Sequence, residues 1–590
     1  MPVENLTASS NASETASVEK SRFLWVIAVI LAAFAVFFVV TAVVGATRWI
    51  HPVPFWDMWD GYLAFWFELQ DGNSSLWWEF SNEHNLLLLK AIFWLDLTLF
   101  SGSQAFLVGV NLLLTAGIAT ALITMLYQRL SFGASQEFSR AMFVALSSTL
   151  VIVTFSWMQG EEFVFPYHAH FLMNILAPLL VFLMLGIAAQ RNDDARPGVT
   201  FFILLAFAAA LLAPWTAASG FFVPFLAAAL AALIGLGYKR ALALLALGVV
   251  GAVIYSTNSL LANPGEDGPI SNFLASPLEV LRFLLVYLGG PWATVTDSQI
   301  IGGVAGGIFI LVVVVAVFSL SRRGKRSISG LTVLSYPVFL VITGALTAAG
   351  RIQLGFEQVT AIRYLTPVLA GWSCLLILAA PRLLKWFTRP LPLASLTLLL
   401  IPILLLPEQL SALTPKQGNL HLRDTATLAV SLGVRDPASV YPIYPWSMER
   451  PIELAARARE EGITVLAREP YASLQSTIGL PDQAKAHVAC AGWIESRTPI
   501  DGSPWDRVDG WVVVSGSSRQ EKVLRLTNRM TETVGWVTVG NTREDVRSQY
   551  PNATGIDGYS GYVRADVPSE NLFIAGDAYR CSEPLNAALG

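Results

Sequence analysis

Long apolar runs recur along the first 407 residues and are separated by short polar connections. They lie at about 23–45, 103–127, 141–158, 168–189, 199–213, 220–236, 240–257, 300–321, 330–349, 364–380 and 391–407. A run of roughly 20 apolar residues can cross a bilayer as a helix. The pattern predicts about 11 transmembrane helices, preceded by a disordered tail at 1–22 that is rich in Ser, Thr, Ala and Asn.

Basic residues mark alternate connections between these runs. They include Lys20, Arg22, Arg129, Arg140, Arg191, Arg196, Lys239, Arg240, Arg322, Arg323, Lys325, Arg326, Arg382, Lys385 and Arg389. By the positive-inside rule this side and the amino terminus face the cytoplasm, and the carboxyl terminus lies outside. The segment 86–100 is apolar but carries Lys90 and Asp96, and counting it as a span would move the later basic loops outside. We therefore predict an interfacial helix on the outer surface there.

Composition narrows the class of protein. Apolar residues make up 54% of the chain and charged residues only 14%, against roughly 25% charged in an average soluble domain. The chain is therefore expected to be an integral membrane protein. A net charge of −4, without a basic stripe, argues against a nucleic-acid partner.

The region 408–590 has a different pattern and is predicted to leave the membrane. From about 486 onward, short alternating runs separated by Gly, Pro, Asp and Asn predict a mainly-β sandwich. Its tryptophans either fill the core or form a sugar-stacking surface; they are Trp493, Trp505, Trp511 and Trp536. Cys490 and Cys581 either pair in an oxidising compartment or are two unrelated thiols.

The first polar loop, 46–102, holds the strongest candidate for catalysis. In its segment PFWDMWDG, Asp57 and Asp60 are three residues apart and would share one face of a helix. Partial exclusion of water by Trp56 and Trp59 would tune the pKa of a carboxylate that acts as a general base. Asp57 is the preferred base. The alternative is a surface helix capped by one aspartate, with the rings in an interfacial aromatic belt.

Two further outer segments contain polar side chains. Glu83 and His84 either contact donor or acceptor or cap the following helix. The segment GEEFVFPYHAH contains four residues of the types that bind metal ions, namely Glu161, Glu162, His168 and His170. Their spacing matches no specific metal motif, so substrate hydrogen bonding is preferred and a divalent cation is the alternative.

The outer loop 350–363 is bracketed by Arg351 and Arg363, with Tyr364 directly after it. Arginine at an outer boundary departs from the positive-inside trend, which indicates a bound anion such as a lipid phosphate. The alternative is snorkelling, or pairing with Glu357.

The order of these features resembles the GT-C class of membrane glycosyltransferases, in their bacterial cell-envelope types. The resemblance rests on the residues Phe55-Trp56-Asp57-Met58-Trp59-Asp60 in the first outer loop and on Gly350-Arg351 through Arg363-Tyr364. It implies a multi-helix catalytic domain at 23–407 and a periplasmic domain at 408–590, the latter similar to carbohydrate-binding modules of arabinosyl- and related transferases. It also implies a bacterial cytoplasmic (inner) membrane protein.

The resemblance implies an inverting transfer from a polyprenyl-phosphate sugar donor to a hydroxyl of an envelope glycan, glycolipid or glycoprotein. Asp57 would be the base, and the arginines would stabilise the departing phosphate. Two other functions stay open: a transporter of polysaccharide or lipid-linked sugar, and an O-antigen ligase or polymerase. A transporter would need charged or broken helices near the bilayer centre. The ligases usually place their key arginines in one large late loop.

Overall fold

The computed structural model of the chain describes residues 4–81, 84–130, 136–262, 269–322, 327–387, 392–484, 486–514, 521–548 and 556–586. The chain forms two compact units. The first comprises Met1–Arg48, Trp77–Leu89 and Leu107–Thr414, and the second comprises Trp49–Leu76, Lys90–Phe106 and Pro415–Gly590. The polar loop predicted at 46–102 therefore contributes to both units.

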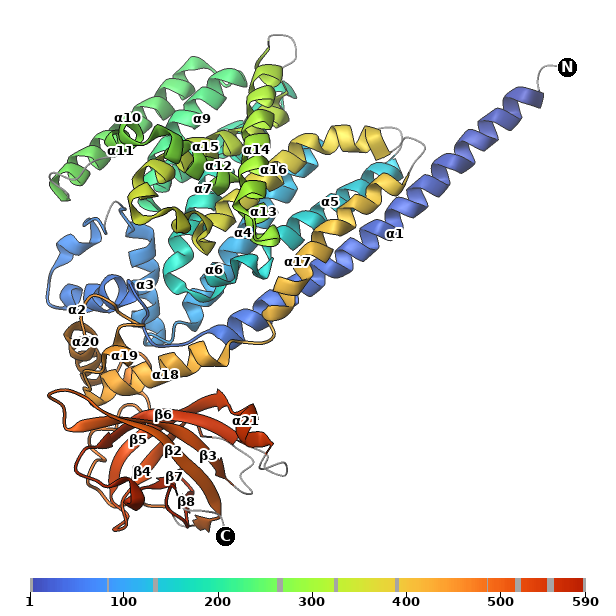
Figure 1. Cartoon of the computed structure of the whole chain (residues 1–590). Helices are drawn as coiled ribbons and strands as arrows, with labels where there is room; N and C mark the ends of the chain where they lie inside the picture. The colour runs from blue at the N-terminus through green and yellow to red at the C-terminus, as the bar shows by residue number, and fades with distance from the viewer. Residues whose placement is uncertain are drawn as a thin grey trace. The chain divides into compact units, whose positions relative to one another are not determined.

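The first unit is built of helices (Figure 1), because an apolar segment can satisfy its backbone hydrogen bonds internally only in this form. Its helices are α1 Glu4–Trp49, α4 Ala105–Arg129, α5 Gln136–Thr154, α6 Gly160–Val164, α7 Ala169–Asp193, α8 Val199–Leu212, α9 Phe222–Leu233, α10 Tyr238–Ala262, α11 Pro269–Ala275, α12 Pro277–Leu288, α13 Gly290–Thr296, α14 Gln299–Ser321, α15 Ile328–Arg351, α16 Ile362–Phe387 and α17 Leu400–Ser411. A further helix, α3 Leu87–Phe100, begins in the first unit and ends in the second.

Each of the predicted apolar runs contains a helix. Among the described residues, eight helices are long and apolar enough to cross a membrane. Three predicted runs form shorter helices, at Val199–Trp215, Ala218–Leu233 and Ser395–Ser411. The chain thus has the helical character of a polytopic membrane protein.

The start of α1 differs from the sequence prediction. The helix begins at Glu4, within the tail that was predicted to be disordered. Helix propagation is less costly than nucleation, so an apolar helix can extend into a preceding segment that contains Ala, Glu and Lys.

The segment 258–299, which the sequence pattern leaves as an outer loop between the apolar runs 240–257 and 300–321, contains the two helices α12 and α13, so that prediction is wrong for these residues. These two helices follow one another with a bend of 73°, and together they are long and apolar enough to form a broken membrane span or a re-entrant loop. The sequence prediction missed them because Glu279, Arg282 and the pair Gly289-Gly290 interrupt the apolar run.

Glycine allows α12 and α14 to pack with their backbones in contact. A Cβ at Gly306 would collide with the carbonyl oxygen of Leu285, and a Cβ at Gly289 would collide with that of Gly302. Gly302 and Gly306 are four residues apart, the spacing that brings small residues to one face of a membrane helix. This contact fixes α12 closely against α14.

In the second unit, the part of α3 from Lys90 onward buries its two ionisable side chains. The Asp96 carboxylate accepts a hydrogen bond of 2.6 Å from the hydroxyl of Tyr62, and Lys90 donates to the carbonyl oxygen of Leu76 at 2.7 Å. Burial raises the pKa of Asp96. The helix predicted at 86–100 is therefore confirmed, but its two ionisable side chains form hydrogen bonds inside the protein.

The remaining helices of the second unit are the π-helix Trp59–Ala64, α2 Phe65–Gln70, α18 Gln417–Leu432, α19 Pro437–Val440, α20 Glu449–Glu460 and α21 Glu544–Arg547. Its strands are β1 Ala486–Val488, β2 Cys490–Pro499, β3 Trp505–Val514, β4 Val523–Thr527, β5 Thr533–Thr542, β6 Ile556–Arg564, β7 Phe573–Ala575 and β8 Tyr579–Cys581.

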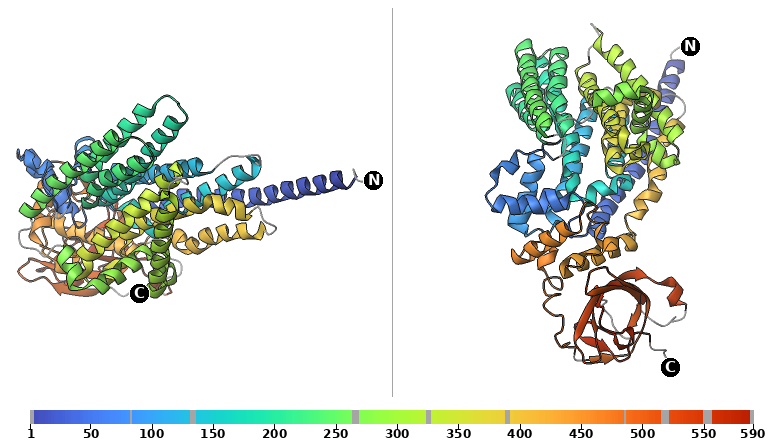
Figure 2. Two further views of the ribbon diagram at one scale, coloured as in Figure 1. Left: turned by 90° about the horizontal axis from the view of Figure 1, so that it is seen from above. Right: turned by 60° about the vertical axis from the view of Figure 1, so that its left-hand side comes forward.

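The strands form one eight-stranded sheet in the order β1-β8-β7-β4-β5-β6-β3-β2. The prediction of a mainly-β domain is confirmed, but a single curled sheet replaces the two stacked sheets of a sandwich (Figure 2). Irregularities in register between Ile494 and Ser496 and between Val539 and Asn541 account for the curvature, since bulges bend the strand that carries them.

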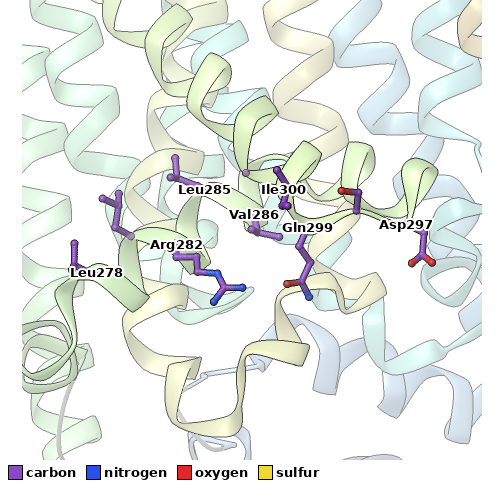
Figure 3. A pocket seen from close by; sticks show the side chains of 10 residues that line it. Leu278, Arg282, Leu285, Val286, Asp297, Gln299 and Ile300 are labelled. Atoms are coloured by element: carbon purple, nitrogen blue, oxygen red, sulfur yellow. The ribbon is translucent and has the colours of Figure 1, made fainter.

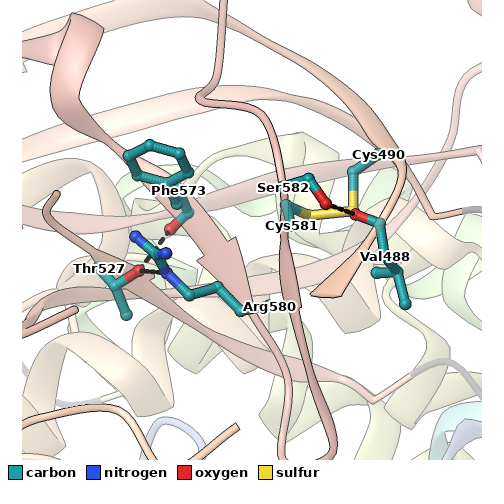
Figure 4. Close-up of a disulfide and its surroundings, with 7 residues drawn as sticks. All are labelled: Val488, Cys490, Thr527, Phe573, Arg580, Cys581 and Ser582. Atoms are coloured by element: carbon teal, nitrogen blue, oxygen red, sulfur yellow. Dashed lines mark hydrogen bonds between the residues drawn. A yellow bond between two sulfur atoms is a disulfide. The ribbon is translucent and has the colours of Figure 1, made fainter. Parts of the chain in front are cut away.

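A disulfide joins the strand at one end of this sheet, β2, to β8, which lies next to the strand at the other end. The chain passes from β1 at one end of the strand order to β2 at the other through a single residue. Cys490 on β2 is bonded to Cys581 on β8, with their Cα atoms 5.4 Å apart (Figure 4). Beside it, the backbone N–H of Ser582 donates to the carbonyl oxygen of Val488 at 2.9 Å. Of the two predictions for these cysteines, pairing is confirmed.

The tryptophans of the sheet do not share one environment. Trp536 is buried in the unit, whereas Trp493 is 46% exposed. Trp505 and Trp511 are half-buried. The four tryptophans therefore form neither a wholly buried core set nor a wholly exposed sugar-stacking surface.

Candidate functional site

The two aspartates of the first polar loop lie in the second unit. Asp57 lies in a turn, and Asp60 lies in the π-helix Trp59–Ala64 that follows. The backbone N–H of Gly61 donates to the carbonyl oxygen of Asp57 at 2.7 Å, which continues the turn into the helix. π-Helical turns are rare and occur frequently at functional sites.

Tyr444 and Arg450, from a distant part of the chain, contact the Asp60 carboxylate. The Tyr444 hydroxyl donates to Oδ2 at 2.7 Å, and Nε of Arg450 donates to Oδ1 at 3.3 Å. Burial, the hydrogen bond to Asp60 and the charge of Asp57 raise the pKa of Tyr444 to about 12. Tyr444 is therefore a protonated donor at neutral pH, and both aspartates lie close enough to act on it electrostatically.

Two tryptophans expose their rings beside these carboxylates. Trp56 is 45% and Trp446 58% exposed, and their ring centroids are 6.1 Å apart. Trp446 also lies edge-on to Tyr444, with centroids 5.0 Å apart. We call Trp56, Asp57, Asp60, Tyr444 and Trp446 the carboxylate–aromatic cluster.

The backbone at Trp56 is strained. Its φ of 51° lies in the left-handed region, which non-glycine residues seldom adopt. A hydrogen bond of 2.8 Å from its N–H to the carbonyl oxygen of Ile443 holds this conformation. Strain of this kind gathers at functional sites. Trp59, by contrast, is fully buried, so it contributes to the packing of the segment and its ring is not exposed to a ligand.

The first unit groups four of the predicted polar residues. Nδ1 of His168 lies 3.3 Å from Oε1 of Glu162, and both side chains are buried. His170 places its Nδ1 2.7 Å from the carbonyl oxygen of Tyr167, and its ring centroid is 6.0 Å from that of His84. We call His84, Glu162, His168 and His170 the histidine–glutamate cluster.

Hydrogen bonds from neighbouring elements support this cluster. Asn111 of α4 donates to the carbonyl oxygens of Glu162 and Phe165 at 2.8 and 3.0 Å, which fixes the irregular turns between α5 and α7. Nδ1 of His84 accepts from the backbone N–H of Ala218 at 3.2 Å. Oε1 of Glu162 is paired with His168, whereas its Oε2 has no hydrogen-bond partner among the described residues, so the cluster retains acceptor capacity at that oxygen.

The described residues offer no support for the divalent-cation alternative. No group of three or more His, Cys, Asp or Glu side chains in the described ranges is arranged to hold a metal ion. Glu161, the fourth member of the predicted set, is exposed. Glu83, which was predicted to contact donor or acceptor, lies outside the described residues.

The predicted phosphate-binding residues also belong to the first unit. Nη2 of Arg363 donates to Oε1 of Gln358 at 3.0 Å, and its guanidinium lies 5.1 Å from the ring of Tyr364. The charge of Arg363 acts on both Glu162 and His168, and this effect is the smallest among those of the surrounding groups. Arg351 is the last residue of α15.

Sequence analysis missed Tyr444, Trp446 and Arg450. A signal was present in the segment YPIYPWSMER at 441–450, which combines Pro, aromatic and charged residues as PFWDMWDG does. The separation of 384 residues between Asp60 and Tyr444 hid their contact.

No protein-family model matches the chain, and no curated protein is significantly similar to it.

Proposed function

We propose that the protein is an inverting membrane glycosyltransferase that moves a sugar from a polyprenyl-phosphate donor to a hydroxyl of an envelope glycan, glycolipid or glycoprotein. The carboxylate–aromatic cluster is the observation that carries this proposal. Carboxylates accept hydrogen bonds from sugar hydroxyls, and exposed aromatic rings offer an apolar face with an adjacent polar edge. Both features occur together at Asp57, Asp60, Trp56 and Trp446.

In the proposed reaction, Asp57 is the general base. Its carboxylate takes the proton of the acceptor hydroxyl as the acceptor oxygen attacks the anomeric carbon of the donor. The bond from that carbon to the phosphate oxygen breaks, and the lipid phosphate leaves with the electron pair. Attack from the face opposite the phosphate inverts the anomeric configuration.

Asp60 is assigned a positioning role. Tyr444 and Arg450 donate to its two oxygens at 2.7 and 3.3 Å, so its carboxylate is already committed to protein donors. Such fixed contacts orient the turn that carries Asp57. Glu68 lies 3.6 Å from Nη2 of Arg450 and extends this set of charges.

The first unit supplies candidates for binding the donor. Arginine and a tyrosine hydroxyl suit a departing phosphate, so the proposal assigns Arg351, Arg363 and Tyr364 to the lipid phosphate. The histidine–glutamate cluster is assigned to hydrogen bonding with donor or acceptor, an assignment favoured by Oε2 of Glu162, which has no partner among the described residues.

The proposed location is a bacterial cytoplasmic membrane, crossed about eleven times, with the C-terminal domain in the periplasm. The Cys490–Cys581 disulfide supports this placement, because such bonds form and persist in oxidising compartments. The curled sheet is proposed to bind an acceptor glycan.

A transfer assay tests the proposal. The purified full-length protein in detergent is incubated with a panel of polyprenyl-phosphate sugars and an envelope glycan acceptor, with and without EDTA. We expect product from one donor class, with inverted anomeric configuration by nuclear magnetic resonance. Retention of configuration would contradict the single-displacement mechanism, and absence of product from a folded protein with every donor would contradict the transferase assignment.

One observation favours a second candidate, a transporter of lipid-linked sugar. The bend of 73° between α12 and α13 is the kind of broken helix that transporters use near their substrate sites. Movement of a lipid-linked sugar across proteoliposome membranes, in the absence of glycosidic product, would support this candidate over the transferase.

A further inference from the structure

The first unit contains a groove between α12 and the beginning of α14. It has a volume of about 610 Å³, and its lining includes Leu278, Leu281, Arg282, Asp297, Gln299 and Gly303. Its apolar wall comes mainly from leucines of α12. In Figure 3 the side chains of Arg282 and Gln299 extend to the same side, away from Leu285. The lining is thus divided into an apolar and a polar part.

Two opposite charges lie in the polar part of the lining. Among the described residues, neither Arg282 nor Asp297 takes part in an ion pair. Figure 3 shows Gln299 between them. The guanidinium of Arg282 stacks on the ring of Phe356 at 4.2 Å, which restricts the arginine without neutralising it. The groove therefore offers one cation and one anion to a ligand.

The walls of the groove are held by backbone packing. Gly302 and Gly306 bring α14 against α12 so closely that no Cβ fits at Gly306. Interfaces of this kind keep membrane helices at a fixed separation. The groove is consequently a built feature of the helix pair, and its shape does not depend on flexible side chains alone.

We propose that this groove binds a phospholipid whose headgroup carries a phosphate and a primary ammonium, as phosphatidylethanolamine does. The phosphate is placed at Arg282 and Gln299, because guanidinium and amide groups donate hydrogen bonds to phosphate oxygens. The ammonium is placed at Asp297, and an acyl chain covers Leu278, Leu281 and other apolar lining residues. This proposal does not depend on the proposed transfer chemistry.

Native mass spectrometry of the full-length protein in detergent tests the proposal, with titration of dioleoyl phosphatidylethanolamine, dioleoyl phosphatidylglycerol and inorganic phosphate. We expect wild type to prefer phosphatidylethanolamine. Arg282→Gln should lower the affinity for both lipids by about tenfold, the order expected for losing a hydrogen bond to a charged group. Asp297→Asn should lower only the affinity for phosphatidylethanolamine, so that the protein no longer prefers one lipid over the other.

A pair of glycine variants controls for indirect effects. A Cβ at Gly303 meets only Val286, at 3.8 Å, and a Cβ at Gly307 meets nothing within 4 Å. Gly303→Leu should therefore fill the groove without breaking the helix contact and abolish binding of both lipids. Gly307→Leu, one turn further along α14 and outside the lining, should bind as wild type does.

Three results would overturn the proposal. If Gly303→Leu and Arg282→Gln bind both lipids with wild-type affinity, the lipid does not bind in the groove. Equal binding of the two lipids by wild type would remove the ammonium contact at Asp297. Saturation by inorganic phosphate at the same affinity as the lipid would assign the site to a free anion.

Discussion

Removal of the Cys490–Cys581 disulfide should open the curled sheet along the line where its two ends meet. The strands at one of these ends are weakly paired with the rest of the sheet, since β8 pairs with β7 through a single residue pair and with β1 through three. The double variant Cys490→Ala/Cys581→Ala removes the covalent bond without leaving an unpaired thiol. The bonded cysteines are 91 residues apart, and for a loop of this length the chain-entropy relation gives about 4–5 kcal/mol of stabilisation.

Hydrogen exchange measured by mass spectrometry on the full-length protein reports this loss segment by segment. Engineered and removed disulfides commonly deliver less than the chain-entropy value, so we expect the free energy of opening to fall by about 3 kcal/mol. That corresponds to roughly hundredfold faster amide exchange in β1, β2 and β8, since 1.4 kcal/mol is a factor of ten.

The control is Cys374→Ala, at the buried free cysteine of α16, which should leave exchange in these strands unchanged. Treatment of wild type with a reductant should reproduce the double variant. Exchange in β1, β2 and β8 that stays within about threefold of wild type after the disulfide is removed would refute the role assigned to it.

Two further predictions concern the second unit. Trp446→Leu removes an exposed ring next to the carboxylates, so the KM for the acceptor should rise by about two- to tenfold with little change in kcat. Steady-state kinetics over a range of acceptor concentrations measures both constants. An unchanged KM would exclude sugar stacking at Trp446. Burial lowers the pKa of His51 despite its 2.9 Å hydrogen bond to Asp424, so the unfolded state binds the proton more readily. The contribution of His51 to stability is therefore complete above about pH 6.5 and is lost as the pH falls below that value. Thermal unfolding between pH 7.5 and 5 should show this loss, His51→Gln should have a flatter profile, and identical profiles would contradict the assignment.

Much of the helical architecture could be predicted from the sequence, because each apolar run carries its own signal. Residues such as those at 23–45 or 300–321 need no distant partner to form a helix in an apolar environment. The pair α12 and α13 escaped detection because Arg282 and Gly289-Gly290 break the run, and the close packing of these helices against Gly302 and Gly306 of α14 is a tertiary contact that leaves no local signal.

The candidate site could be predicted only in part. Asp57 and Asp60 were found because they lie among aromatic residues within one short segment. Tyr444 and Arg450 were not, because their contact with Asp60 comes from tertiary folding and leaves no local motif. The same limit applies to the sheet: alternation predicted its strands, but the pairing of β1 with β8 depends on chain segments about 90 residues apart.

The most direct test of the account is the rate of sugar transfer by Asp57→Asn, measured beside wild type and Asp71→Asn at equal amounts of folded protein. Asp71 is a matched control on the same segment, since its carboxylate is paired with Arg457 at 2.7 Å and is assigned no part in the reaction. General-base catalysis typically contributes about 10²–10⁴-fold, so kcat should fall by at least a hundredfold in Asp57→Asn and stay near wild type in Asp71→Asn. Transfer by Asp57→Asn at the wild-type rate would remove Asp57 from the mechanism.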